Sequence, residues 1–282
     1  MSKIYIVTDS TADIPKTLDE AGEIIVVPLN VTHGGKTYRD GIDLTVDGLL
    51  EILKTSEETP KTSQVNPQSF YNIYSELLKD DCYIISFHLS SQLSGTYQSA
   101  VIAKEMLGSD RIFVIDSKSI SMGTAFLAIE ALRMVRNGQD VHYIVSKVTE
   151  LSNRVRAIFA VDTLEYLKKG GRVSPAQAAI GTMLNIKPLI CMKDGKLEVF
   201  DKVRGLKKAL KRLVSHMVED GVDKDMLFAP GHADNNEAML EFKKMVEEET
   251  GITGAYTTFT VGSVVAVYSG PGVVGCNYFV KE

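Results

Sequence analysis

The chain has 282 residues, of which 44% are apolar and 24% are charged, so it is long enough for two domains with substantial cores. A formal net charge of −5 argues against a protein that binds nucleic acid by bulk attraction. The charge is unevenly distributed, because residues 168–212 carry twelve Lys and Arg against three acidic residues. This basic stretch is either a solvated face or a docking surface for an acidic or phosphate-bearing partner.

Strand and helix patterns alternate through the first half of the chain. The apolar run Ile4–Val7 predicts a strand, and Asp13 is the expected N-cap of a helix with Pro15 near its first position. The next expected strands are 23–31, 83–89 and 111–115, and the next expected helices begin at Thr45, Asn66, about Thr96 and about Ser119. Such alternation predicts a mostly parallel sheet with helices on both faces.

The pattern changes after about residue 155, where a hairpin turn at Asp194-Gly195 separates two short strands. The other elements expected here are strands over 156–161 and 226–229, helices over 164–168, 174–184, 205–220 and 235–250, and two terminal strands. We therefore predict an α/β protein of two domains. Residues 1–155 form a three-layer α/β/α domain with a mostly parallel sheet, and residues 156–282 form an α+β domain with a mixed sheet.

The cysteines and the apolar runs indicate a cytoplasmic protein. Cys82, Cys191 and Cys276 are sparse, odd in number and outside any C-x-x-C motif, which favours a reducing compartment. The first residues run directly into a strand pattern, so we expect no signal peptide. The apolar runs are too short to cross a bilayer, so we expect no stable membrane insertion.

Five Ser and Thr side chains occur in ten residues, Ser90–Ser99, between a strand pattern and a helix pattern. A strand that leads into a helix start exposes backbone N–H groups and the positive end of the helix dipole, which suit an anion. Ser94 and Thr96 add O–H donors, and Gly95 lets a ligand approach the backbone closely. Thr62 and Ser63 form a second hydroxyl loop before a helix. The sequence therefore predicts a site for a small negatively charged group.

Other motifs carry weaker signals. Asp9 and Ser10 end the first strand, where Asp9 is either a nucleophile or metal ligand, or part of a helix-capping cluster that organises the loops. Gly270–Gly275 matches G-x-G-x-x-G, but a strand pattern follows it, so we expect a tight turn and not a nucleotide site. The five histidines lack metal-binding spacing, so no metal site is expected.

Two arginines are candidates for contact with a phosphate or carboxylate. Arg172 follows a Gly-Gly break between two helix patterns, and Arg204 lies just before a helix. A plain connector between helices explains Arg172 equally well. The choice between these interpretations stays open from the residues alone.

Taken in order, these motifs resemble the DegV family of bacterial fatty-acid-binding proteins. The matching segments are Val7–Asp13, Tyr38–Gly41, Thr62–Gln64, Ser90–Ala100, Asp162–Ser174, Lys187-Pro188 and Gly270–Gly272. They cover nearly the whole chain. The family commonly has a histidine just before the terminal Gly-Pro-Gly, where this chain has Tyr268.

The resemblance implies a protein of two domains that buries a long-chain fatty acid, such as palmitate, and uses no other cofactor. The carboxylate would lie against Thr62 and Ser94, with Ser63, Gly95, Thr96 and Tyr268 as further head-group residues. Some family members present the lipid to a separate ATP-binding subunit of a fatty acid kinase. In that scheme Arg172 and Arg204 would face the acyl phosphate or the kinase.

We therefore expect a carrier with no catalytic residues, and two alternatives remain. One is a hydrolase or phosphotransferase that uses Ser94 or Asp9. The other is a regulatory module for a different small anion, such as a phosphorylated metabolite. The expected partners are the fatty acid and a kinase subunit, without nucleic acid.

Overall fold

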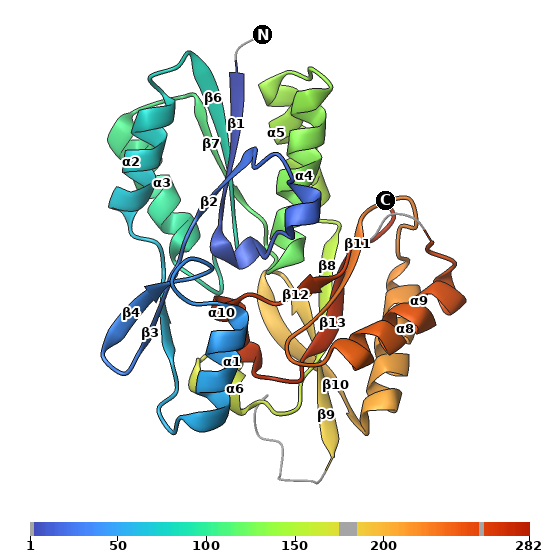
Figure 1. The fold of residues 1–282 in the computed structure, drawn as a ribbon. Coiled ribbons are helices and arrows are strands. Elements are labelled where there is room, and N and C mark those ends of the chain that lie inside the picture. Colours follow the sequence, from blue (N-terminus) through green and yellow to red (C-terminus); the bar gives the residue numbers. More distant parts are fainter. Residues whose placement is uncertain (1–2, 175–184, 254–256) are drawn as a thin grey trace.

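The computed structural model describes residues 3–174, 185–253 and 257–282, which fold around two main β-sheets (Figure 1). The first sheet has four parallel strands in the order β2-β1-β6-β7. Its strands are β1 (Lys3–Asp9), β2 (Ile24–Val27), β6 (Cys82–His88) and β7 (Ile112–Asp116). Strand β6 is buried along nearly its whole length, as expected for a strand that is covered on both faces.

Two helix pairs cover the faces of this parallel sheet. Helices α2 and α3 pack together on one side, and helices α4 and α5 pack together on the other (Figure 1). They are α2 (Pro67–Leu77), α3 (Thr96–Leu107), α4 (Met122–Arg136) and α5 (Val141–Ser152). The predicted three-layer α/β/α arrangement is therefore confirmed. Helix α5, which Asp140 caps by accepting from two backbone N–H groups, has no counterpart among the predicted elements.

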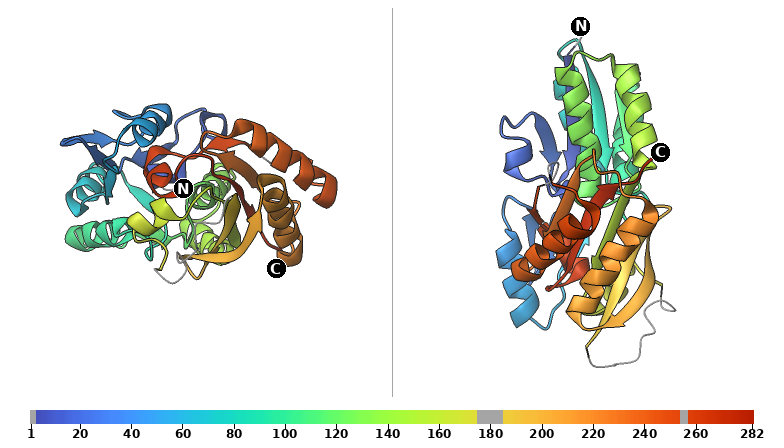
Figure 2. Two further views of the ribbon diagram at one scale, coloured as in Figure 1. Left: turned by 90° about the horizontal axis from the view of Figure 1, so that it is seen from below. Right: turned by 90° about the vertical axis from the view of Figure 1, so that its right-hand side faces the viewer.

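The second sheet is mixed and has the strand order β10-β9-β8-β13-β11-β12. Its strands are β8 (Val155–Ala160), β9 (Ile186–Lys193), β10 (Lys196–Arg204), β11 (Phe228–His232), β12 (Phe259–Thr260) and β13 (Val274–Phe279). Helices α8 (Leu206–Asp220) and α9 (Asn236–Thr250) cover one face of it (Figure 2). The predicted hairpin turn is confirmed, because Asp194 and Gly195 both have positive φ.

A small antiparallel sheet and three short helices connect the two main sheets. The sheet has the order β4-β3-β5 and consists of β3 (Asn30–His33), β4 (Lys36–Arg39) and β5 (Lys61–Ser63). The helices are α1 (Val46–Thr55), α6 (Glu165–Lys169) and α10 (Ser263–Ser269). Helix α10 packs on α1, α6, β3 and β5, so it joins the end of the chain to its first quarter.

Two local predictions are wrong. Asp13 is not the N-cap of a helix; it is the C-cap of the short 3-10 helix η1 (Ser10–Ala12), in a left-handed conformation, and Asp9 is the N-cap. The expected strand over 23–31 is divided at Pro28, which has no N–H to donate to a ladder, and its halves join different sheets. The helix expected over 174–184 lies, beyond its first residue, outside the described residues.

One apolar core runs between the two main sheets. Helix α4 contacts β1 and β6 of the parallel sheet and also β8 and β13 of the mixed sheet. The rings of Phe126 and Phe279 stack across this boundary with centroids 5.4 Å apart. A second apolar cluster lies between the mixed sheet and helices α8 and α9. The domain boundary expected at residue 155 stays a prediction, although β8 begins there.

Candidate functional site

A cavity of about 330 Å³, which we call the main cavity, lies where loops of the parallel sheet meet α10 and the mixed sheet. Its polar lining includes Thr62, Ser63, Gln64, Ser94, Arg172 and Tyr268, and its apolar lining includes Leu29, Leu89, Ile120, Phe159, Leu167 and Val265. The volume falls within the range of about 300 to 1,000 Å³ that is usual for small-molecule sites. The structure therefore brings together, in one cavity, most of the residues that the sequence predicted for a head group.

Two hydroxyl groups meet at the wall of the main cavity. Thr62 Oγ1 of β5 and the phenol oxygen of Tyr268 in α10 are hydrogen bonded at 2.5 Å. The Tyr268 ring lies so close to Gly170 that a Cβ there would be 2.3 Å from Cδ1 of the ring. The glycine therefore permits the approach that places the phenol beside Thr62.

The loop before α3 supplies the second hydroxyl group. Ser94 Oγ accepts from the Thr96 N–H at 3.2 Å and is hydrogen bonded to Thr96 Oγ1 at 3.0 Å. Thr96 itself is fully buried and does not line the main cavity, so the structure does not place it with the other predicted head-group residues. Its position behind Ser94 instead fixes the orientation of the Ser94 hydroxyl.

Gly95 is required because the side chain of Gln64 crosses it. A Cβ at Gly95 would lie 2.0 Å from Gln64 Oε1, closer than any real contact. Gln64 Nε2 donates to Ser99 Oγ at 3.0 Å, which ties the β5 loop to the first turn of α3. Gln64 is a cavity residue that the sequence reasoning did not assign.

Arg172 provides the one charged side chain among the described residues that line the main cavity. Its Nε donates to the Leu93 carbonyl at 3.2 Å and its Nη1 to the Gly170 carbonyl at 2.5 Å. Its guanidinium lies 4.5 Å from the centre of the Tyr268 ring. The cavity thus combines hydroxyl donors with a single positive charge, a set that suits an anion.

Arg172 also borders a second hollow, which we call the basic cleft. It has a volume of about 740 Å³, and Lys168 and Lys196 line it together with Glu198. Arg204 lines neither hollow. It is exposed at the end of β10, seven residues and roughly 23 Å along the strand from the cavity residue Leu197.

Asp9 and Ser10 fix the loops that border the main cavity. Asp9 Oδ1 accepts from the N–H of Thr11 at 3.1 Å and from its hydroxyl at 2.5 Å. Ser10 Oγ accepts from the Leu29 N–H at 3.1 Å. Thr11 and Leu29 both line the main cavity, so the hydrogen bonds of Asp9 and Ser10 position parts of its wall.

Asp9, His88 and Ser86 form a hydrogen-bonded chain that the sequence reasoning missed. His88 Nδ1 lies 2.9 Å from Asp9 Oδ2, and His88 Nε2 lies 2.8 Å from Ser86 Oγ. The order resembles a catalytic triad, but all three side chains are fully buried, and neither Ser86 nor His88 lines a described cavity. Ser86 also accepts from the buried Tyr74 hydroxyl at 2.7 Å. This chain therefore satisfies buried polar groups within the sheet.

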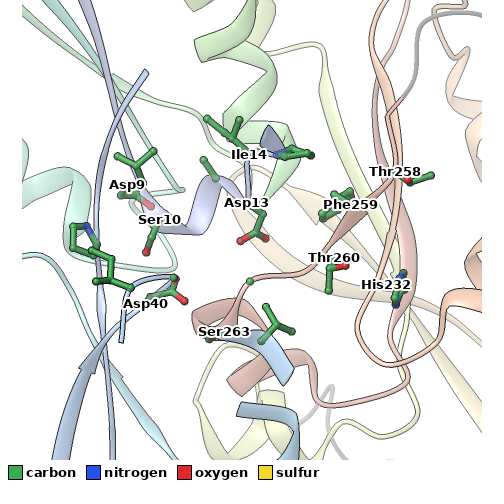
Figure 3. Close-up of a pocket in the computed structure, with 18 of the residues that line it drawn as sticks. Asp9, Ser10, Asp13, Ile14, Asp40, His232, Thr258, Phe259, Thr260 and Ser263 are labelled. Atoms are coloured by element: carbon green, nitrogen blue, oxygen red, sulfur yellow. The ribbon is translucent and has the colours of Figure 1, made fainter. Parts of the chain in front are cut away.

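A third hollow, the acidic cleft, has a volume of about 690 Å³ and lies beside the turn that follows β1 (Figure 3). Asp9, Asp13 and Asp40 line it, and no Lys or Arg is present among its described lining residues. Burial raises the pKa of the Asp13 carboxyl well above its usual value, and burial likewise raises the pKa of Asp40. The acidic cleft therefore offers no Lys or Arg among its described lining residues to pair with a carboxylate, in contrast to the main cavity.

The glycine-rich segment before β13 forms a tight turn, as predicted. Gly270 and Gly272 both have positive φ, and Cβ atoms there would collide with the Tyr166 ring and the Asp162 carboxylate. A strand follows this turn, so the helix that a dinucleotide site requires is not formed. Among residues 3–174, 185–253 and 257–282, no group of three or more acidic, His or Cys side chains is arranged to hold a metal ion. Within the same ranges no helix has both the length and the apolar character needed to cross a bilayer.

The fold and the cavity define an α/β protein with a candidate ligand site between a parallel sheet and a mixed sheet. The model of a family described as uncharacterised proteins of the DegV family matches residues 3–281. The chain belongs to this family.

Relatives agree with this assignment over their whole length. A DegV domain-containing protein of Caldanaerobacter subterraneus is 39% identical over 280 residues, which cover 98% of each chain. A fatty-acid-binding DegV family protein of Thermus thermophilus has 30% identity and a TM-score of 0.91, with 99% of this chain and 100% of that one covered. DegV of Bacillus subtilis, described as a fatty acid binding protein, has 33% identity and a TM-score of 0.87, with both chains fully covered.

Proposed function

We propose that the protein binds a long-chain fatty acid, such as palmitate, and carries it in the main cavity. The carboxylate lies against Thr62, Ser94 and Tyr268 beside Arg172, and the acyl chain extends along the apolar wall. One observation carries this proposal: three hydroxyl side chains and a single positive charge meet an apolar lining in one cavity. Solved relatives described as fatty acid binding proteins support it.

The energetics of burial are sufficient for tight binding. A sixteen-carbon acid has about fifteen CH₂ and CH₃ groups, and burial of each stabilises the complex by roughly 0.8 kcal/mol, on the order of 12 kcal/mol in total. Lost motion of the ligand offsets part of this sum, and micromolar or tighter affinity remains. The head group needs donors because a bare buried carboxylate is strongly disfavoured. The sparse, unpaired cysteines fit a cytoplasmic carrier.

Native mass spectrometry before and after organic extraction tests the proposal. We expect the purified protein to lose a mass of fatty-acid size on extraction and to regain it with added palmitate. Release of a phosphorylated metabolite would instead identify a regulator that binds a different anion. Repeated absence of any fatty acid from protein made in a lipid-replete host would overturn the carrier proposal.

The carrier and a hydrolase make opposite predictions for turnover. Among the described residues no histidine lines the main cavity, so Ser94 has no imidazole base beside it there. We therefore expect no hydrolysis of acyl esters by the isolated protein. In Ser94→Ala the carrier loses affinity for lipid, whereas a hydrolase would lose measurable turnover.

We further propose that the basic cleft docks the ATP-binding subunit of a fatty acid kinase. It adjoins the main cavity through Arg172 and adds two lysines. Lys196 lines the basic cleft but not the main cavity, so Lys196→Glu should reduce phosphorylation of the bound lipid and leave lipid retention intact. Lys202→Glu on the same strand, outside the cleft, is the matched control. Unchanged phosphorylation in Lys196→Glu would show that the cleft does not dock the kinase.

A further inference from the structure

A smaller cavity of about 40 Å³, the distal cavity, adjoins the main cavity. Four residues line both of them: Ile120, Phe159, Val265 and Ser269. None of these four is charged, and the distal cavity is otherwise lined largely by apolar residues, including Ala157, Val261 and Val273. An acyl chain with its head at Thr62 therefore has an apolar continuation between the two sheets.

The floor of the distal cavity is a row of residues in register across the mixed sheet. Phe159 of β8 is paired with Gly275 of β13, Gly275 with Gly231 of β11, and Gly231 with Phe259 of β12. Residues opposite one another on neighbouring strands share a face of the sheet. Two glycines thus lie between two phenylalanines, and neither has room for a Cβ, because the Phe259 ring covers Gly231 and β8 lies against Gly275.

The Phe259 ring closes the distal cavity on the side of the acidic cleft. A Cβ at Gly231 would lie 2.2 Å from Cε1 of this ring, so the ring occupies the space above the glycine. Phe259 is buried and lines both the distal cavity and the acidic cleft. Figure 3 shows it among the cleft residues, on the segment that also carries Thr258 and Thr260. The ring is therefore the wall between the largely apolar distal cavity and a cleft that is lined by three aspartates.

We infer that Phe259 sets the longest acyl chain that the protein accepts. This inference rests on the proposed function and assigns the far end of the same site. The carboxylate is directed to Arg172, because no Lys or Arg is among the described residues that line the acidic cleft beyond Phe259. The methyl end then enters the distal cavity and stops at the Phe259 ring.

Competition among saturated acids of different length tests this inference. Delipidated protein is mixed with equal amounts of acids of 14 to 22 carbons, and native mass spectrometry measures the bound ratios. Phe259→Ala should raise the ratio of 20-carbon to 16-carbon acid on the order of tenfold, because each newly buried methylene contributes roughly fourfold in affinity. Ala157→Val, which fills the distal cavity, should lower the same ratio.

The controls separate this inference from the proposed function. Phe259→Leu removes less side-chain volume than Phe259→Ala, and it replaces that variant in the competition experiment if the alanine variant does not fold. Phe228→Leu makes the same change on β11 but on the opposite face, against α8 and α9, and should leave the ratio unchanged. Unaltered ratios in folded, lipid-bound Phe259 variants would overturn the inference alone. A wild-type protein that binds none of the acids would overturn the proposed function and the inference with it.

Discussion

Thr62 Oγ1 and the Tyr268 hydroxyl are hydrogen bonded at 2.5 Å although 206 residues separate them in the chain. Thr62 is on β5 of the small sheet and Tyr268 is in α10, which packs against that strand. The pair is ready to donate to an anion because each hydroxyl has one proton and the two share a single hydrogen bond. A ligand carboxylate at this point would accept from the second proton.

Thr62→Val keeps the shape of the side chain and removes this donor. A hydrogen bond to a charged group contributes about 1.5 to 3 kcal/mol. We therefore expect palmitate to bind roughly 10- to 150-fold more weakly, measured by titration of delipidated protein. Thr37→Val, at an exposed position of the same small sheet, should leave affinity unchanged. An unaltered dissociation constant in Thr62→Val would place the head group elsewhere.

Gly95→Ala should weaken lipid binding through Gln64. Gly95 has φ of −74°, which any residue adopts, so only the clash with the Gln64 side chain opposes a methyl group there. Shortening Gln64 to alanine removes this clash, and the double variant should bind lipid better than Gly95→Ala alone. A double-mutant cycle on the dissociation constants should give a coupling of about 1 kcal/mol. If the two substitutions changed the free energy of lipid binding additively, this result would contradict the contact between Gly95 and Gln64.

Arg172→Gln should reduce affinity for fatty acid in a salt-dependent manner. The variant loses the single positive charge among the described cavity residues, and dissolved ions screen such an attraction. We expect a loss of about tenfold at low ionic strength that becomes smaller in about 0.5 M salt. Arg172→Lys retains the charge and should behave more like the wild type. A loss that is independent of salt would indicate that Arg172 acts by packing on Tyr268.

Asp13→Asn should stabilise the protein at neutral pH. Because burial raises the pKa of Asp13 in the folded state, stability is lost as pH rises from the ordinary carboxyl value through that raised pKa. The loss is about 1.4 kcal/mol for each tenfold increase in proton affinity, and the amide, which is never charged, avoids it. The amide oxygen also preserves an acceptor for the Ser121 hydroxyl. Urea unfolding at about pH 5 and about pH 8 should show a larger gain at the higher pH.

Asp43→Asn is a control for which we expect the opposite change in stability. Hydrogen bonding to Arg39 lowers the pKa of the exposed Asp43 carboxyl to about 2. Its contribution to stability is therefore present above the ordinary carboxyl pKa and is lost as pH falls toward 2. The amide variant should be slightly less stable than the wild type at neutral pH. A gain at the higher pH in Asp43→Asn equal to that in Asp13→Asn would show that net charge, and not burial, causes the effect.

Local sequence signals were sufficient for most of the fold. The turn at Asp194-Gly195 and the helix start at Asn66-Pro67 depend on residues adjacent in the chain, and both are confirmed. Helix α10 was not predictable in this way, because Val264–Tyr268 is rich in β-branched residues that favour strands. Packing of this segment on α1, β3 and β5 overrides that preference. The N-cap role predicted for Asp13 was wrong for a similar reason, since its hydrogen-bond partner Ser121 is 108 residues away in the chain.

The sequence predicted those parts of the candidate site that lie in short local motifs. Ser94, Gly95 and Thr62 stand out as hydroxyl and glycine residues in loops before helices. The contacts of Gln64 with Ser99 and of Asp9 with His88 join separate loops, so no local pattern indicates them. The placement of Gly231 and Gly275 side by side in the floor of the distal cavity depends on register across neighbouring strands, which a single sequence does not specify.

Assembly of the main cavity has a consequence for how the protein matures. Its lining comes from segments that are synthesised first, such as Thr11, and from α10. A nascent polypeptide cannot close the cavity until residues 263–269 have left the ribosome and packed against β5. Ligand binding therefore requires that α10 has packed in place. A ligand that binds only the assembled cavity stabilises the folded state relative to the unfolded chain.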